Sequence, residues 1–301
     1  MRLGTSSNLF GQKRRSNEIL PYHEQVMRSY EAGFKVFNIG FASAFQKGAE
    51  LANDNWEQII YDLANESAKL GIEYPQSHAP FSSDFYVRGR QPSEEALAHF
   101  NEIMRRSILA SEMLGVKWVT IHPIDDNINT EFETDVITKT NVEFFSPWFE
   151  MAKKHNVGFA IENVAEFDRE RIRRRFGTTT DDLISVVDTF ADDAFGITWD
   201  FGHARNMIKD QCRQLRKLGK RIKATHVQDN KGVVDSHLIP FVGGDIPWES
   251  IMPCLKEIGY EGDFIFETHS FMNQFPEELK LSAARLAYDF GMYCMKLYDE
   301  A

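Results

Sequence analysis

Residues 158–200 carry the pattern that decides the fold, which reads GFAIEN at 158–163, TDDLISVVDTF at 180–190 and GITWD at 196–200. The first and last of these runs are short and apolar, as buried strands are. The middle run has apolar residues three and four positions apart, which is typical of a helix that packs one side against a core. The order strand, helix, strand predicts two parallel strands joined by a helical crossover.

The same alternation extends through the chain in both directions. Helices are expected at residues 53–70, 93–114, 180–190 and 248–258, with Asn53, Ser93 and Thr180 as N-caps. Strands are expected at residues 3–7, 35–40, 73–78, 118–122, 158–163, 196–200, 222–227 and 263–267, and a helical stretch follows each of them. This order, without a linker, predicts an α/β fold: a single (β/α)₈ TIM barrel domain that covers residues 1–301.

The composition favours a small-molecule substrate. The chain has 301 residues, of which 43% are hydrophobic, and its formal net charge is -11. Negative charge opposes binding to nucleic acid or to an anionic membrane, because both require clustered Lys and Arg. The opening MRLGTSSNLF lacks an apolar signal-peptide segment, and no run approaches the roughly 20 apolar residues of a membrane span. We expect a cytoplasmic protein without nucleic-acid or membrane partners, and a homo-oligomer is left open.

Ionisable side chains stand at the ends of six of the expected strands. Successive strand ends of a closed barrel face one axial pocket, so residues far apart in the sequence meet there. Three carboxylates and one imidazole would then converge, and a divalent cation is the means of holding such buried charges together. We expect Mn²⁺, with Mg²⁺, Co²⁺ or Zn²⁺ as alternatives. The residues are His78, His122, Glu162, Asp200 with His203, His226 and Glu267, and Asp235 and His237 lie on the loop after the seventh strand.

Each of these residues also has a purely structural interpretation. A single His after a strand, such as His78 or His122, is more often a hydrogen-bonded packing residue than a ligand. Glu162, Asp200 and Glu267 could each form an ion pair with a neighbouring Lys or Arg. Their recurrence at successive strand ends favours the shared metal site.

The motifs around these residues resemble those of the xylose isomerase-like TIM barrel superfamily. That superfamily includes sugar phosphate isomerases and epimerases, ketose epimerases, inosose isomerases and dehydratases, and endonuclease IV. The strongest motifs are IEN at 161–163, WDFGH at 199–203, HVQDNKG at 226–232, DSHLIPFVGGDIPW at 235–248 and FET at 266–268. The resemblance extends through nearly the whole chain, from LGTSSN at 3–8 to FET.

The resemblance implies roles for individual residues. In the ketose-epimerase branch a Glu, an Asp, a His and a Glu after strands five to eight hold the metal, and by motif these roles fall on Glu162, Asp200, His226 and Glu267. Residues implied to contact the substrate directly or to support the site are His78, His122, His203, Asp229, Lys231 and His237. Asp235 and His237 are also candidates for binding an additional metal ion.

This set of residues predicts a metal-dependent sugar isomerase or epimerase. A metal bound to adjacent hydroxyl and carbonyl oxygens stabilises an enediolate, so one carboxylate can remove the proton α to the carbonyl and another can return it. Glu162 and Glu267, at strand ends three units apart, are the expected catalytic acid/base pair.

The main alternative lies within the same superfamily. Endonuclease IV holds three zinc ions with nine ligands, and each ligand has a counterpart by motif among the strand-end and loop residues given above. A zinc-dependent abasic-site endonuclease therefore stays open, although the acidic chain disfavours it. The basic run RERIRRR at 169–175 is interpreted as a solvated loop, a grip on a substrate phosphate or carboxylate, or a DNA contact. An inosose dehydratase, a C-glycoside-cleaving subunit with a partner chain and a catalytically silent binding protein also remain open.

Overall fold

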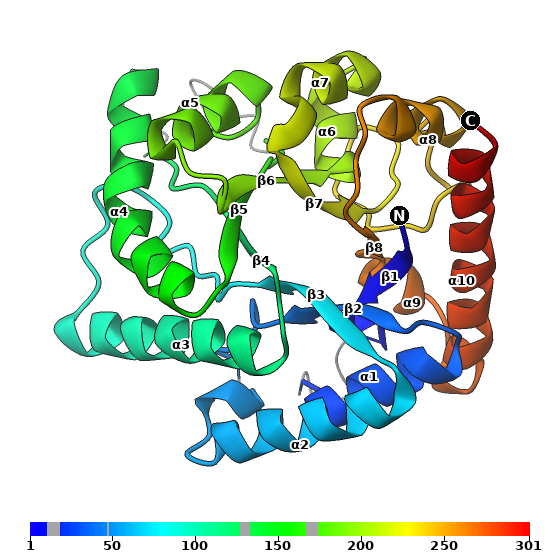
Figure 1. Ribbon diagram of the computed structural model, residues 1–301, viewed down its shortest axis with the longest axis horizontal. Coiled ribbons are helices and arrows are strands. Elements are labelled where there is room, and N and C mark those ends of the chain that lie inside the picture. The colour runs from blue at the N-terminus through cyan, green and yellow to red at the C-terminus, as the bar shows by residue number, and fades with distance from the viewer. Residues whose placement is uncertain (11–18, 47, 127–132, 167–173) are drawn as a thin grey trace.

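Eight parallel strands form a closed barrel ringed by helices (Figure 1). The computed structural model describes residues 1–10, 19–46, 48–126, 133–166 and 174–301. Strands pair in chain order around the barrel, and Leu3 opposite Phe264 closes the ring between the first strand and the last. The strands are β1 Leu3–Ser6, β2 Val36–Gly40, β3 Glu73–His78, β4 Trp118–Ile121, β5 Gly158–Glu162, β6 Phe195–Asp200, β7 Ile222–Val227 and β8 Phe264–Phe266.

The helices follow the strands around the outside. The α-helices are α1 Tyr22–Glu31, α2 Trp56–Leu70, α3 Glu94–Met113, α4 Thr134–Lys154, α5 Thr180–Phe190, α6 Phe201–Met207, α7 Gln211–Leu218, α8 Trp248–Glu257, α9 His269–Met272 and α10 Glu277–Glu300. Short 3₁₀ helices are η1 Ser7–Phe10, η2 Glu50–Ala52 and η3 Gly219–Arg221. Within the described ranges, none of these helices is long and apolar enough to cross a membrane.

The expected strands and helices are confirmed, but two of the three expected N-caps are wrong. Ser93 caps α3 as expected, since its Oγ accepts a hydrogen bond from the Ala96 N–H at 3.2 Å. Asn53 ends η2 instead of starting α2, because its own N–H donates back to the Glu50 carbonyl. At α5 the cap is Thr179 rather than Thr180, and its Oγ1 accepts from the N–H of residue 182.

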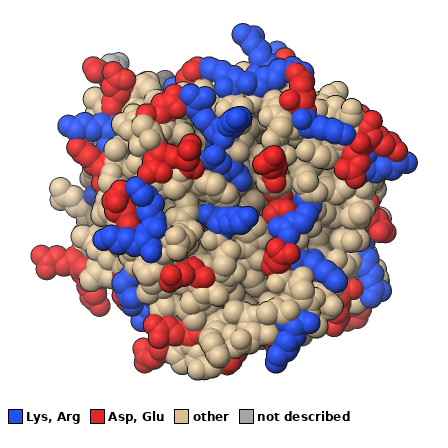
Figure 2. Space-filling view, viewed as in Figure 1, with Lys and Arg blue, Asp and Glu red and all other residues tan. Residues whose placement is uncertain are grey.

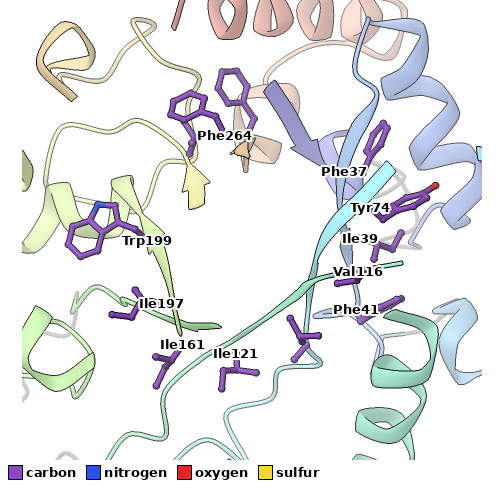
Figure 3. Close-up of a cluster of buried hydrophobic side chains, with 14 of the residues drawn as sticks. Phe37, Ile39, Phe41, Tyr74, Val116, Ile121, Ile161, Ile197, Trp199 and Phe264 are labelled. Carbon is purple, nitrogen blue, oxygen red and sulfur yellow. The ribbon is translucent and has the colours of Figure 1, made fainter. Parts of the chain in front are cut away.

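The strands place alternate side chains toward the helices and toward the barrel interior. Ile197 and Trp199 of β6 point outward into the buried apolar layer, as Ile161 does from β5 (Figure 3). Thr198, between the first two, faces inward, and its Oγ1 lies 2.9 Å from Thr120 Oγ1 across the barrel. The next inward position on β6 is Asp200. The alternation that fills the core therefore also brings a carboxylate to the C-terminal mouth of the barrel.

Candidate metal centre

Side chains from four neighbouring strands meet at the C-terminal mouth of the barrel. Glu162 ends β5, Asp200 ends β6 opposite His226 of β7, and Glu267 directly follows β8. One ligand atom from each of these four residues lies within 4.8 Å of the ligand atoms of the other three. The structure thus brings together the four residues that the sequence suggested as metal ligands.

His226 links the two glutamates of this group. Its Nδ1 lies 2.7 Å from Glu162 Oε1 and 3.4 Å from Glu267 Oε2. Asp200 Oδ1 accepts a hydrogen bond from the His203 backbone N–H at 2.6 Å, but the buried Oδ2 of Asp200 has no hydrogen-bond partner among the described residues. A buried carboxylate oxygen without a partner is costly. Three carboxylates and one imidazole around such an atom fit a hard or borderline divalent cation.

The surroundings of the two glutamates keep them ionised. Burial alone would raise the pKa of Glu162 and of Glu267. The positive charge of His226 holds both pKa values below their usual range, helped by a hydrogen bond from His122 at Glu162 and by the charge of His237 at Glu267. Burial raises the pKa of Asp200 to about 7. Burial by itself would lower the pKa of His226. The negative charges of Glu162 and Glu267 beside the ring outweigh this effect and raise the pKa to about 9. Both glutamates can therefore accept a proton at neutral pH.

A second group of potential ligands shares Glu162. His122 Nε2 lies 3.0 Å from Glu162 Oε2, and His78 Nε2 lies 3.7 Å from the same oxygen. The two imidazole nitrogens face each other at 3.1 Å. Burial lowers the pKa of His122 to about 4, so this ring is neutral and has a lone pair to offer. The geometry is that of a second potential cation site beside the first.

A third group lies on the opposite side, between α6 and the loop after β7. Asp235 Oδ2 is 2.9 Å from His237 Nε2 and 3.3 Å from His203 Nε2. His237 has a φ of +44°, a left-handed conformation that is strained for a residue with a side chain. Its Nδ1 is held 2.8 Å from the Glu267 carbonyl. The loop thus places Asp235 and His237 in the lining of the cavity at the barrel mouth.

His269 belongs to this mouth as well, and the sequence interpretation missed it. The residue groups with His237 and Glu267 as potential ligands. A signal was present, because His269 follows Glu267 by two positions in FETHS. Only the strand end itself was expected to supply ligands, whereas the short helix α9 starts directly after it and keeps the His269 side chain at the mouth.

Asn38 of β2 is the second residue that the sequence interpretation missed. Its Nδ2 lies 2.7 Å from His226 Nε2, and its buried Oδ1 has no hydrogen-bond partner among the described residues. Rotating this amide by half a turn would place Oδ1 against Nε2. Nε2 then carries the proton, and the lone pair of Nδ1 becomes free to bind a metal. No sequence signal marks Asn38, because the final residue of its strand is a glycine.

Two residues with expected substrate or supporting roles lie away from the cavity. Asp229 is buried, and its carboxylate accepts hydrogen bonds from Trp248 Nε1 at 2.8 Å and from the Ile246 N–H at 3.1 Å. These contacts hold the loop of residues 228–247, so Asp229 supports that loop. Lys231 is exposed and is not part of the cavity lining. Its charge instead lies near Asp245, whose pKa it helps to lower, so the structure does not bring Lys231 to the mouth.

Most of the potential ligands line one cavity of about 670 Å³, whereas Asp200 and His226 are fully buried and are not part of its lining. Its floor is formed by residues at the strand ends, including His78, His122, Glu162 and Glu267. Phe81, from the loop after β3, lies with its ring centroid 4.5 Å from that of His122 and provides an apolar wall. The remaining lining residues are Asn8, Ile19, Gln25, Ala42, Ser43, Gln46, His203, Asp235, His237, His269, Asn273 and Lys280. A cavity of this size can enclose a small molecule.

Comparison with known proteins identifies the fold and similar chains. A family model described as a xylose isomerase-like TIM barrel matches residues 27–287. An uncharacterized protein of Methanocaldococcus jannaschii is 26% identical over 234 residues, which cover 73% of this chain and 76% of that protein. An uncharacterized protein of Mycobacterium leprae is 27% identical over 258 residues, which cover 77% of this chain and 85% of that protein.

Solved structures show the same architecture over the full length. A D-tagatose 3-epimerase-like protein superposes with a TM-score of 0.73 at 22% identity, covering 100% of this chain and 99% of the other. A D-psicose 3-epimerase from Clostridium cellulolyticum H10, solved with D-tagatose, superposes with a TM-score of 0.72 at 16% identity. This match covers 98% of this chain and 99% of the other. An IOLI protein with a binding zinc atom superposes with a TM-score of 0.70 at 18% identity, and the match covers 100% of this chain and 99% of the other. At these identities the likeness establishes the barrel fold.

Proposed function

The chain belongs to the xylose isomerase-like TIM barrel family, and on that premise we propose that it is a divalent-metal-dependent isomerase or epimerase of a sugar-like substrate. The observation that carries the proposal is the convergence of Glu162, Asp200, His226 and Glu267 within 4.8 Å at the mouth of the barrel. The buried Oδ2 of Asp200, which accepts no hydrogen bond from the described residues, supports a cation at this place. The epimerases among the structural neighbours act on ketoses by their names, and the IOLI protein was solved with zinc.

The two glutamates are proposed to move the proton. Glu162 and Glu267 extend from β5 and β8, three strands apart around the ring, so they can approach a substrate from different sides. Both are ionised at neutral pH, so either can take the proton on the carbon next to the carbonyl while the other, once protonated, returns one. A divalent ion held there would polarise the substrate carbonyl and stabilise the negative charge that develops as the proton leaves.

Hydrogen exchange tests this proposal directly. The purified protein is loaded with Mn²⁺ in D₂O and incubated with ketoses, aldoses and inososes, and loss of the α-proton signal is followed by NMR. We expect exchange with at least one substrate. Glu162→Gln and Glu267→Gln should each slow it by at least about a hundredfold, because each removes a group that transfers the proton.

A surface glutamate provides the matched control. Glu112→Gln makes the same chemical change on α3, where the carboxylate pairs with His155 away from the cavity, and it should keep normal exchange. If Glu162→Gln and Glu267→Gln also keep normal turnover with metal bound, the assignment of the acid/base pair is wrong. If no sugar or inosose exchanges a proton, the proposed function itself is wrong.

One observation favours a second candidate, a multi-metal phosphoester hydrolase of the endonuclease IV type. Besides the four-residue group, the structure brings His78 and His122 to Glu162, and His203 and His237 to Asp235. Nine residues in three of the four adjoining groups could hold three cations. The charge distribution weighs against a DNA substrate, because the net charge is -11 and Figure 2 shows acidic and basic side chains interspersed on the face in view.

Only the end of the basic run at 169–175 lies in the described part of the chain. Residues 169–173 lie outside the described residues, whereas the last two arginines of the run are paired internally. Arg174 Nη2 donates to Asp182 at 2.8 Å, and Arg175 lies 3.6 Å from Asp125. Incision of abasic-site duplex DNA by the purified protein, abolished by a chelator, would establish the second candidate in place of the first.

A further inference from the structure

Lys280 brings a positive charge into the wall of the cavity. It lies in the first turn of α10 and is only 2% exposed. Its Nζ donates to the Phe10 carbonyl of η1 at 3.2 Å and lies 3.2 Å from Glu277 Oε2. An ammonium group has three N–H donors, and the third has no partner among the described residues.

The cavity lining therefore carries charges of both signs. Glu162, Asp235 and Glu267 line the barrel side, and Lys280 is the one Lys or Arg among the described lining residues. A lysine is rarely buried without a strong partner, because removing the ammonium from water is costly. Its one carboxylate partner, Glu277, has a side chain that is 56% exposed and also accepts from Arg28. That partner compensates Lys280 only in part, and the unused donor can bind an anion.

Neutral hydrogen-bonding groups also contribute to the lining. Asn8, Gln25, Ser43 and Asn273 line the same cavity and come from η1, α1 and the segments after β2 and α9. Amide and hydroxyl groups of this kind bind sugar hydroxyls. The cavity thus offers carboxylates and imidazoles at the strand ends, hydroxyl-binding groups beyond them, and a buried cation.

We propose that the substrate carries an anionic group, either a phosphate ester or a carboxylate, at the end remote from its carbonyl, and that Lys280 binds this group. This inference rests on the proposed function, because it specifies the substrate class of the same cavity. Lysine binds both groups as a compact point charge, so the two sources share one recognition chemistry. Conversion of 6-phosphates compared with 6-carboxylates distinguishes the two groups.

The main test compares D-ketohexoses, each as the neutral sugar, the 6-phosphate and the 6-carboxylate. The wild-type protein with Mn²⁺ should convert one anionic form with a kcat/KM at least about tenfold above that of the neutral sugar. In Lys280→Gln this preference should fall about tenfold to a hundredfold, mainly through KM, because the lost contact binds ground state and transition state alike. Lys280→Arg keeps the charge and should retain part of the preference.

A lysine on the same helix serves as the control. Lys296→Gln removes a side chain that is 63% exposed and pairs with Glu300, so its preference should equal that of the wild type. If the wild type converts neutral and anionic forms equally well, or if Lys280→Gln keeps the wild-type preference, the inference is overturned while the proposed function stands.

A binding measurement separates this inference from the proposed function. Inorganic phosphate is titrated into metal-free protein by calorimetry, with folding of each variant checked by circular dichroism. Millimolar phosphate should bind to the wild type and to Lys296→Gln, and Lys280→Gln should lose this binding. If no ketose is converted in any form, the kinetic comparison gives no preference and the calorimetry alone decides. Phosphate binding that depends on Lys280 then supports the anion site, and its absence overturns it.

Discussion

At the scale of single residues, Asn38 connects the barrel wall to the candidate metal centre. A histidine that binds a metal through one ring nitrogen carries its proton on the other, and the partner of that proton fixes the ring orientation. For His226 this partner is the amide of Asn38, 2.7 Å away and buried in β2. The unpartnered Oδ1 of Asn38 is the acceptor that such a proton requires. We therefore regard Asn38 as a positioning residue that acts through His226.

Replacing Asn38 tests this role. Asn38→Ala removes the acceptor and should weaken metal binding about tenfold to a hundredfold, a range typical for partners of metal-binding histidines. Competition against a chelator of known affinity measures the metal dissociation constant without any need for turnover. Asn65→Ala, on the exposed side of α2, is the control and should leave that constant unchanged. An Asn38→Ala protein that is folded and binds metal with wild-type affinity would rule out the positioning role.

At the scale of elements, the loop of residues 228–247 determines the third group of potential ligands. The loop is anchored by Asp229, whose carboxylate accepts hydrogen bonds from Trp248 and from backbone N–H groups at both ends of the loop. Gly244 packs directly on this carboxylate, because a Cβ added there would lie 2.0 Å from Asp229 Oδ1. Asp235 and His237 are therefore held by a buried anchor, although the loop has no helix or long strand of its own.

A methyl group at Gly244 should disturb this anchor. Gly244→Ala should destabilise the protein by about 1–3 kcal/mol through overpacking. Since the loop carries Asp235 and His237, we expect it also to reduce the number of metal ions bound per chain, measured by elemental analysis at saturation. Gly71→Ala is a useful contrast, because its Cβ meets open space and its left-handed backbone costs a residue with a side chain about 1–2 kcal/mol, so it should keep the wild-type metal content. Equal stability and equal metal content in both variants would show that Gly244 tolerates a side chain.

At the scale of the whole molecule, the barrel was predictable because its information is local and repeated. Each βα unit has an apolar strand and an amphipathic helix. In the closed ring, strands that follow one another in the sequence lie side by side. The positions of Glu162, Asp200, His226 and Glu267 follow from this rule alone, since each ends a strand or comes within one residue of the end.

Side chains outside the strand ends were not predictable in the same way. Asp229 lies in the same motif as His226, but its side chain turns toward the loop backbone. The sequence does not reveal which side this side chain faces. Lys280 looks like an ordinary surface lysine in the run EELKLS, and its burial arises only because α10 starts beside η1. Contacts between segments 270 residues apart depend on loop geometry, which local spacing does not encode.

The whole molecule should gain stability from the metal. A ligand that binds only the folded state stabilises it by RT ln(1 + [L]/Kd), which is about 2.7 kcal/mol at a hundredfold excess over Kd. In a large domain this corresponds to a rise in melting temperature of roughly 5 °C. Chelator-treated protein, scanned by calorimetry with Mn²⁺, Mg²⁺, Co²⁺ or Zn²⁺, should show this rise for the ion that fits.

Two aspartate variants separate a specific site from surface binding. Asp200→Asn removes one charge from the cluster and should abolish most of the rise, because its Oδ2, which accepts no hydrogen bond from the described residues, is the atom that the cation would satisfy. Asp188→Asn removes a surface carboxylate that pairs with Arg221, and it should keep the full rise. If the two variants respond to the metal equally, the stabilisation comes from ions spread over the acidic surface, and the cluster at the barrel mouth is not the site that binds them.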